Sequence, residues 1–216
     1  MARTNAAAPE DAYERLRSQI VTGTLMPNER LVEIDLADRL GVGRAAIRTF
    51  LTRLEQEGLV VREPNRGARV RMVTEAEAIE ITQTRMMLEA LVAREAATRA
   101  TRDEVAEMRA ILAEMEQRLN AGELLLYSDG NARLHAVILR ASRHATAARL
   151  ISSLKAQTVR FQYRTVLVPG RPRHSYAEHT AIVDAIDAGD ADAAEAAMRT
   201  HLSHVTTTLR ESHAQQ

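Results

Sequence analysis

The sequence predicts a mainly α-helical protein in two parts: three short helices with a two-stranded hairpin, and then an all-α antiparallel helical bundle. Three observations support this fold class. Ala, Leu, Arg and Glu dominate the 216 residues and favour helix over strand. Candidate strands occur only between residues 59 and 73. From residue 74 onward, apolar residues recur at helical spacing almost throughout.

We expect four segments along the chain. Residues 1–10 form a flexible tail, residues 11–73 a first domain, residues 74–211 a helical domain, and residues 212–216 a second tail. Hydrophobic residues make up 45% of the sequence, which is enough to bury a core in each domain.

The composition excludes several classes of protein. The chain has no Cys, which excludes a disulfide framework, a thiolate zinc site and a catalytic Cys. It has no apolar run long enough to span a bilayer, so we expect no transmembrane helix. Met1–Pro9 lacks an apolar segment and is typical of a loose tail rather than a signal peptide. We therefore expect a cytoplasmic protein without a membrane partner.

Turn residues separate the expected elements of the first domain. Its helices cover residues 11–22, 34–40 and 44–57, and glycine-containing turns follow at 23–28, 41–43 and 58. Two candidate strands, residues 59–62 and 68–73, flank the turn at Pro64–Gly67. Three helices followed by such a hairpin form a winged helix-turn-helix.

The charge distribution supports a DNA-binding role for this domain. Net charge is zero overall, but residues 1–73 carry 12 Arg against 10 acidic residues. Within the hairpin, Glu63 is the one acid beside four arginines at positions 62, 66, 69 and 71. Backbone phosphates favour such a cationic edge through counterion release. The alternative is an edge strand that charges protect from aggregation.

The third helix has two distinct faces. Ile47, Phe50, Leu51 and Leu54 cluster on one side, which we expect to pack on the first two helices. The other side contains residues 44, 45, 48, 49 and 52 and is expected to face outward. In a recognition helix this outer face enters the major groove, where arginines at its N-terminal end bind guanine or phosphate.

These segments resemble the GntR superfamily of transcription regulators. The resemblance rests on residues 25–33, 36–44, 47–48, 51, 53–55 and 57–60, with Arg66-Gly67 and Val70 similar to the wing. It implies that Arg44 and Arg48 bind DNA and that Gly67 enters the minor groove, and we add Thr49, Arg66 and Arg69 as DNA-binding candidates.

Three departures from the family pattern concern the recognition helix. Gly43 replaces the usual Ser or Thr, Ala46 replaces a common Pro, and Thr49-Phe50 replaces a usual Glu-Ala. Because Thr49 is on the outer face, we expect the base preference to differ from that of relatives.

The helical domain contains two capping-box sequences and four expected breaks. Thr74–Glu77 and Thr101–Glu104 have the capping-box pattern. The breaks are expected at residues 120–122, 129–130, 169–172 and 189–190, which gives about six helices.

Three histidines and one asparagine form a candidate metal site. Asn131 precedes His135 by four residues, so both side chains share one helix face, and His179 and His201 lie in the last two expected helices. Three imidazoles and an oxygen suit a borderline divalent metal such as zinc or nickel. The alternative is that each histidine is a structural or surface residue.

The order and spacing of these residues resemble the FCD domain of the FadR-type branch of the GntR superfamily. There an Asp four residues before a His, and two later His, typically bind the metal. The resemblance implies that His135, His179 and His201 are ligands, with Asn131 in the place of the Asp as a neutral and poorer ligand.

The same resemblance implies a small carboxylate as effector. Arg85 matches a position where relatives carry Arg followed four residues later by Glu; its alternative role is an i,i+4 ion pair with Glu89. Arg133 is a second candidate for effector binding.

From these features together, we expect a homodimeric regulator that binds a palindromic operator on double-stranded DNA and responds to the effector. Our hypothesis is that it acts as a repressor. Three alternatives remain open at this point: the metal ion is itself the signal, the protein is a metal-dependent hydrolase, or it binds DNA constitutively and its histidines are structural. No HExxH pattern or glycine-rich phosphate loop supports the hydrolase, and we expect that the protein is not an enzyme.

Overall fold

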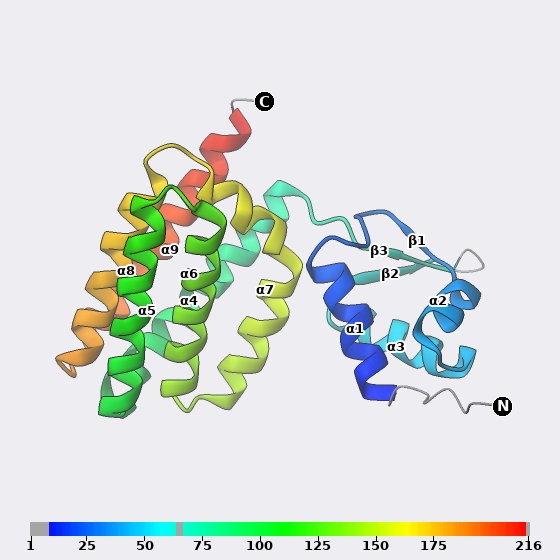
Figure 1. The fold of residues 1–216 in the computed structure, drawn as a ribbon, viewed down its shortest axis with the longest axis horizontal. Helices are drawn as coiled ribbons and strands as arrows, with labels where there is room; N and C mark the ends of the chain where they lie inside the picture. Colours follow the sequence, from blue (N-terminus) through cyan, green and yellow to red (C-terminus); the bar gives the residue numbers. More distant parts are fainter. Residues whose placement is uncertain (1–8, 64–66, 215–216) are drawn as a thin grey trace. The chain divides into compact units, whose positions relative to one another are not determined.

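The computed structural model describes residues 9–63 and 67–214 and divides into two compact units, each of which is described by itself. The first unit contains the chain up to residue 73 together with residues 155–160. The second contains residues 74–154 and the chain from residue 161 onward. Figure 1 shows the elements of both units, which confirm the mainly helical fold class.

Three helices form most of the first unit. They are α1 (Pro9–Val21), α2 (Glu33–Leu40) and α3 (Arg44–Gln56). Tyr13 and Leu16 of α1 pack with Ile47, Leu51 and Leu54 of α3, and all five side chains are almost fully buried. The apolar side of α3 therefore contacts the other helices as its pattern predicts, which leaves the opposite side exposed.

A three-stranded antiparallel sheet completes this unit. Its strands are β1 (Arg30–Leu31), β2 (Val60–Glu63) and β3 (Gly67–Val70), in the order β1-β3-β2. The sequence does not predict β1 because two residues are too few to show alternation. The expected strand to residue 73 ends at Val70, and one further bond follows, from the Arg71 amide to the Leu59 carbonyl.

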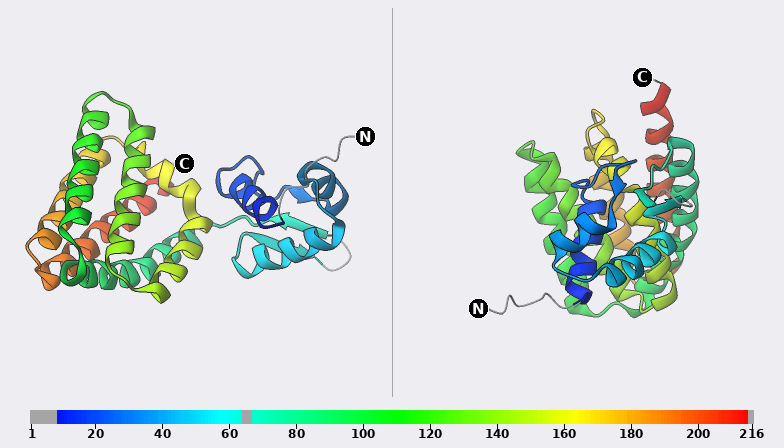
Figure 2. Two further views of the ribbon diagram at one scale, coloured as in Figure 1. Left: turned by 60° about the horizontal axis from the view of Figure 1, so that its bottom comes forward. Right: turned by 90° about the vertical axis from the view of Figure 1, so that its right-hand side faces the viewer.

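Among the described residues, six long helices form the second unit. They are α4 (Glu75–Arg99), α5 (Arg102–Asn120), α6 (Leu124–Ala141), α7 (Ala145–Val166), α8 (Arg171–Asp187) and α9 (Ala191–Ala214), except that residues 155–160 of α7 group with the first unit. α4 packs mainly on α9, α5 on α6 and α8, and α8 on α9. The helices can be followed from two further directions in Figure 2. The bundle thus has the expected architecture.

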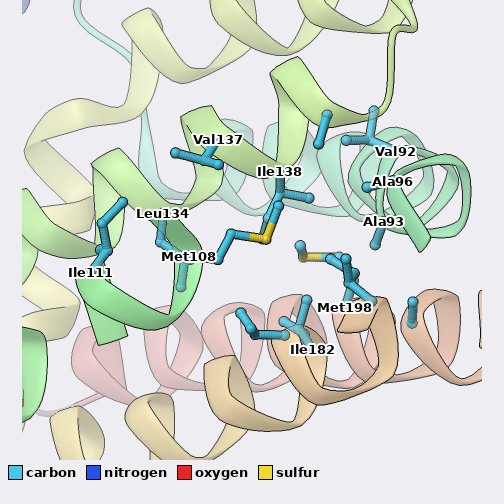
Figure 3. Close-up of a cluster of buried hydrophobic side chains, with 14 of the residues drawn as sticks. Val92, Ala93, Ala96, Met108, Ile111, Leu134, Val137, Ile138, Ile182 and Met198 are labelled. Atoms are coloured by element: carbon cyan, nitrogen blue, oxygen red, sulfur yellow. The ribbon is translucent and has the colours of Figure 1, made fainter. Parts of the chain in front are cut away.

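Aliphatic and methionine side chains fill the centre of this bundle. Figure 3 shows Met108 of α5, Ile138 of α6, Ile182 of α8 and Met198 of α9 converging on the small side chains of α4. Ala93, with no exposed surface, is one of these small residues. Such small residues let α4 and α9 pack closely against each other.

One expected boundary in the second unit is wrong, and one actual boundary was not expected. The break predicted at Asp129-Gly130 lies inside α6, whereas a break that the sequence did not suggest follows Ala141, where Arg143 adopts a left-handed backbone (φ 54°). Gly130 is inside the helix because α5 passes close to it: a Cβ atom there would lie 2.6 Å from Met115 Cγ. The glycine therefore serves helix packing, not chain reversal.

The expected tails are also too long. α1 begins at Pro9 rather than at residue 11, because proline is well tolerated in the first turn of a helix. α9 continues to Ala214, three residues beyond the expected end at 211, since no glycine or proline interrupts it. Both capping sequences lie at helix starts, and Thr101–Glu104 forms the full reciprocal capping box.

Gly130→Ala should destabilise the second unit. Alanine favours a helix by about 1 kcal/mol over glycine, but overpacking a buried contact typically costs about 1–3 kcal/mol. Because Met115 has no exposed surface, we expect the overpacking cost to exceed the helix gain and the melting temperature to fall. Thermal unfolding measures this, and Ala132→Gly at an exposed position of α6 gives the scale of helix propensity alone. A more stable Gly130→Ala variant would show that Met115 can move aside at little cost.

Candidate functional site

The exposed side of α3 presents the arginines that the sequence singles out. The side chains of Arg44 and Arg48 are 57% and 59% exposed, and Thr49 is also exposed. α3 begins after Gly43, whose backbone is extended and supplies no side-chain cap. Helix N-termini attract anions through their backbone N–H groups and the helix dipole. The start of α3 therefore combines two exposed cations with an N-terminus that no side chain caps.

A carboxylate that sequence reasoning missed lies between the two arginines. Arg48 Nε donates to Glu33 Oε2 over 2.9 Å, and Arg44 Nη2 lies 3.8 Å from the same oxygen. Glu33 is in the first turn of α2, and no local pattern links it to residues 11 and 15 positions away. Such exposed pairs are worth at most ~1 kcal/mol, so DNA can displace the carboxylate easily.

The hairpin adds two further cations to the first unit, and one of them contacts α3. Arg62 Nη1 donates to Thr52 Oγ1 of α3 over 3.2 Å, and Arg69 Nη1 donates to the Asn28 carbonyl over 3.1 Å. Gly67 is exposed with a φ of 85°, a left-handed backbone that suits glycine. Arg66, the other wing candidate, lies outside the described residues.

A cluster of three buried histidines lies in the second unit. His135 of α6, His179 of α8 and His201 of α9 are 6%, 0% and 3% exposed. One ring nitrogen from each lies within 4.8 Å of the others, and the ring centroids of His179 and His201 are 4.3 Å apart. Three helices thus bring together the three histidines that the sequence predicts as one site.

Two carboxylates orient these imidazoles, and sequence reasoning missed both roles. Nδ1 of His135 lies 2.8 Å from Glu89 Oε2, and Nδ1 of His201 lies 2.7 Å from Glu178 Oε2. Because carboxylates accept, each Nδ1 carries the proton, and each Nε2 is left with a lone pair. Metal-binding histidines commonly have this carboxylate partner.

Each orienting carboxylate is in turn held by an arginine, which is half-buried Arg85 for Glu89 and buried Arg171 for Glu178. Arg85 Nη2 lies 2.7 Å from Glu89 Oε1, and Arg171 contacts both oxygens of Glu178 at 3.0 and 2.8 Å. The exposed His204 also contacts Glu178, at 2.7 Å. Burial tends to raise the pKa of Glu178, but the bonds from His201 and Arg171 outweigh it and lower the pKa to about 2. Two arginine–carboxylate–imidazole chains therefore converge on the cluster.

Burial favours the neutral form of His201. Burial lowers the pKa of His201, and the attraction of Glu178 offsets this only in part. The Nε2 atoms of His135 and His179 lie 3.2 Å apart, and Ser175 Oγ lies 3.4 Å from Nδ1 of His179. If His135 accepts at Nε2, His179 donates there, so hydrogen bonds alone can also satisfy these two rings. Neutral imidazole is the form that binds metal.

One distance within the cluster matches the spacing of two ligands on a divalent metal ion. Two nitrogens bound to one tetrahedral zinc at ~2.0–2.1 Å are about 3.3–3.4 Å apart, close to the 3.2 Å between His135 and His179. Asn131 lies one helical turn before His135, and its buried Oδ1 has no hydrogen-bond partner within the described part of the chain. A buried amide oxygen without a partner is costly, and coordination would satisfy it.

The two effector candidates have different surroundings. Arg85 is 12% exposed and makes the i,i+4 pair with Glu89 that was its alternative role. Arg133 is exposed and donates to Glu114 over 2.8 Å. The structure does not bring Arg133 to the histidine cluster, because residues two apart in a helix, such as Arg133 and His135, project to opposite sides.

Comparison with known proteins identifies both units. A model of the FCD domain matches residues 80–204, more than half of the chain, and a model of the bacterial regulatory proteins of the gntR family matches residues 9–70. The chain belongs to the GntR family of bacterial transcription regulators, with an FCD domain. This confirms the resemblance seen in the sequence.

Curated relatives of this GntR regulator match nearly the whole chain. An HTH-type regulator in an unstable DNA locus of Streptomyces ambofaciens is 30% identical, covering 95% of this chain and 86% of that protein. The HTH-type transcriptional repressor RspR of Escherichia coli is 25% identical (94% and 89% coverage). A probable D-xylose utilization operon repressor of Paenarthrobacter nicotinovorans is 26% identical (86% and 81%). Each of these relatives is named a transcriptional regulator or repressor, and the family is one of transcription regulators rather than enzymes, which removes the hydrolase alternative.

Solved structures share the fold. McbR/YncC of E. coli superposes with a TM-score of 0.78 at 20% identity, covering 95% of this chain and 98% of that one. A GntR regulator from Rhodococcus sp. RHA1 gives 0.71 at 22% identity, covering 94% and 97%. Among the described residues of this GntR regulator, no helix is long and apolar enough to cross a membrane.

Arg48→Ala should weaken DNA binding by this regulator. If Arg48 contacts a phosphate, its loss reduces the slope of log affinity against log salt concentration by about 1. If it contacts a base, its loss costs ~1–3 kcal/mol of binding free energy and relaxes the preference at that base pair. Fluorescence anisotropy with labelled duplexes at several salt concentrations measures both effects. Arg102→Ala, at an exposed position in the second unit, is the control, and equal affinities for all three proteins would remove Arg48 from the interface.

Glu33→Gln should have the opposite effect on non-specific DNA. The change removes a negative charge beside Arg44 and Arg48, so non-specific affinity should rise and its salt dependence should steepen. The same titration with a random duplex measures this. An unchanged salt slope would mean that Glu33 lies outside the electrostatic footprint of DNA.

Proposed function

We propose that this regulator acts in the cytoplasm as a homodimeric repressor, and that a small carboxylate bound beside a divalent metal ion changes its affinity for a palindromic operator. The buried histidine cluster carries the proposal, because three imidazoles converge there. Asn131, one helical turn before His135, adds a buried amide oxygen that has no hydrogen-bond partner among the described residues. The names of RspR and of the D-xylose operon relative support a repressor.

In this proposal the second unit holds the metal ion through His135, His179 and His201, with Asn131 as a fourth ligand. Glu89 and Glu178 fix which nitrogen of His135 and His201 is free to bind. The metal, zinc or nickel by its ligand types, supplies a positive charge to which a carboxylate can bind directly. Arg85 is committed to Glu89, so its proposed contribution to effector binding is indirect, through His135.

In the first unit, the proposal assigns DNA contacts to Arg44, Arg48 and Thr49 of α3 and to the wing residues Arg66, Gly67 and Arg69. Two copies of the chain place two α3 helices in successive major grooves of a palindrome. Coupling between effector and operator of ~1–3 kcal/mol is typical of such switches.

The metal part of the proposal has a direct test. Purified protein is stripped with a chelator, and its melting temperature is recorded with and without Zn²⁺ or Ni²⁺. We expect the ion to raise the melting temperature of the wild type but not of His179→Ala, because a ligand that binds only the folded state stabilises it. His174→Ala, at an exposed position of the same helix, should behave as the wild type. A metal-independent wild type with an intact fold would favour structural histidines.

The regulatory part is tested with DNA from the region flanking the regulator's own gene. Gel-shift titrations in the presence of metal, with and without a panel of small carboxylic acids, measure the operator affinity. We expect at least one acid to change it by about 5–150-fold. If the operator affinity changes with the metal but with none of the acids, the ion itself is the signal. If it changes with neither, the protein binds DNA constitutively.

A further inference from the structure

The four candidate ligands of the histidine cluster bring no negative charge to it. Three are the imidazoles of His135, His179 and His201, which bind a metal in their neutral form, and the fourth is the carboxamide of Asn131. Asp129, two residues before Asn131, is exposed. A divalent ion bound by these four groups keeps its full charge of two.

The carboxylates next to the cluster are already neutralised. Glu89 contacts Arg85, and these side chains are 4% and 12% exposed; Glu178 contacts Arg171, and these are 12% and 8% exposed. Each pair sums to zero charge, and both are shielded from water. The surroundings of the cluster are therefore electrically balanced before an ion enters.

Burial makes the imbalance costly. The three histidines are at most 6% exposed, so water can stabilise an ion there only weakly. A buried charge without a partner of opposite sign costs several kcal/mol. An anion that enters with the metal cancels this cost, and one that carries two charges cancels it completely.

We propose that the metal ion and a chelating dicarboxylate bind to this site as a pair, and that each binds weakly without the other. This inference rests on the proposed function and makes it more specific: a dianion such as malonate is the effector class, and a monoanion such as acetate acts only partly. The regulator then responds to the product of two concentrations and stays unresponsive when either component is scarce. Because binding free energies are reciprocal, the dicarboxylate tightens metal binding by the same factor by which the metal tightens dicarboxylate binding.

The test measures the dissociation constant of the full-length protein for Zn²⁺ in a titration in which a metal buffer sets the free Zn²⁺ concentration at each point. The counter-anion is perchlorate, acetate or malonate at one ionic strength. We expect the dissociation constant to fall by about tenfold or more from perchlorate to malonate, with acetate in between. Thermal unfolding in the same solutions gives a second readout.

Asn131→Asp supplies the missing charge within the protein. In perchlorate this variant should bind Zn²⁺ about tenfold more tightly than the wild type, and malonate should add less to its affinity. Asn120→Asp adds the same charge at an exposed position and should leave both affinities unchanged.

The outcomes separate this inference from the proposed function. If Zn²⁺ binds tightly in perchlorate and malonate adds nothing, the paired binding is wrong while the metal site stands. If neither Zn²⁺ nor Ni²⁺ binds with any of the anions, the metal site itself is wrong. An Asn131→Asp variant that binds metal no better than the wild type would contradict the charge argument.

Discussion

The polar centre of the helical bundle depends on the two chains in which an arginine holds a carboxylate and the carboxylate holds an imidazole. They run from Arg85 through Glu89 to His135 and from Arg171 through Glu178 to His201. A buried histidine or carboxylate without partners would be too costly for a domain of ordinary stability. Since each group satisfies the next, α4, α6, α8 and α9 can meet around polar side chains.

The sequence predicted the parts of this centre that follow from local spacing. His135, His179 and His201 stood out by their placement in expected helices, and Asn131 by its distance of one turn from His135. Glu178 did not, because neighbouring positions in a helix project in different directions, and only packing against α9 shows that its carboxylate reaches His201. The partnership of Glu89 with His135 likewise joins α4 to α6 and has no signal in either segment.

The boundaries of the elements show the same division between local and long-range information. Glycine at positions 41, 58 and 189 marks real helix ends, since each adopts a left-handed backbone there. Gly130 is also a glycine, but it lies within a helix and allows the close approach of Met115. Spacing along the chain cannot reveal such a contact between helices. β1 escaped prediction for a related reason: its two residues are a strand only because β3 lies beside them.

The contact of Glu33 with both Arg44 and Arg48 has a consequence for how the recognition helix tolerates change. A carboxylate shared by two guanidinium groups makes the two positions interdependent, so removal of one arginine leaves Glu33 to the other and alters its readiness to turn toward DNA. The energetic effects of substitutions at 44 and 48 are then not additive, and a double-mutant cycle measures the difference. A substitution at one of these arginines that changes the operator preference will therefore also change the contribution of the other arginine to DNA binding, even though that residue is unchanged.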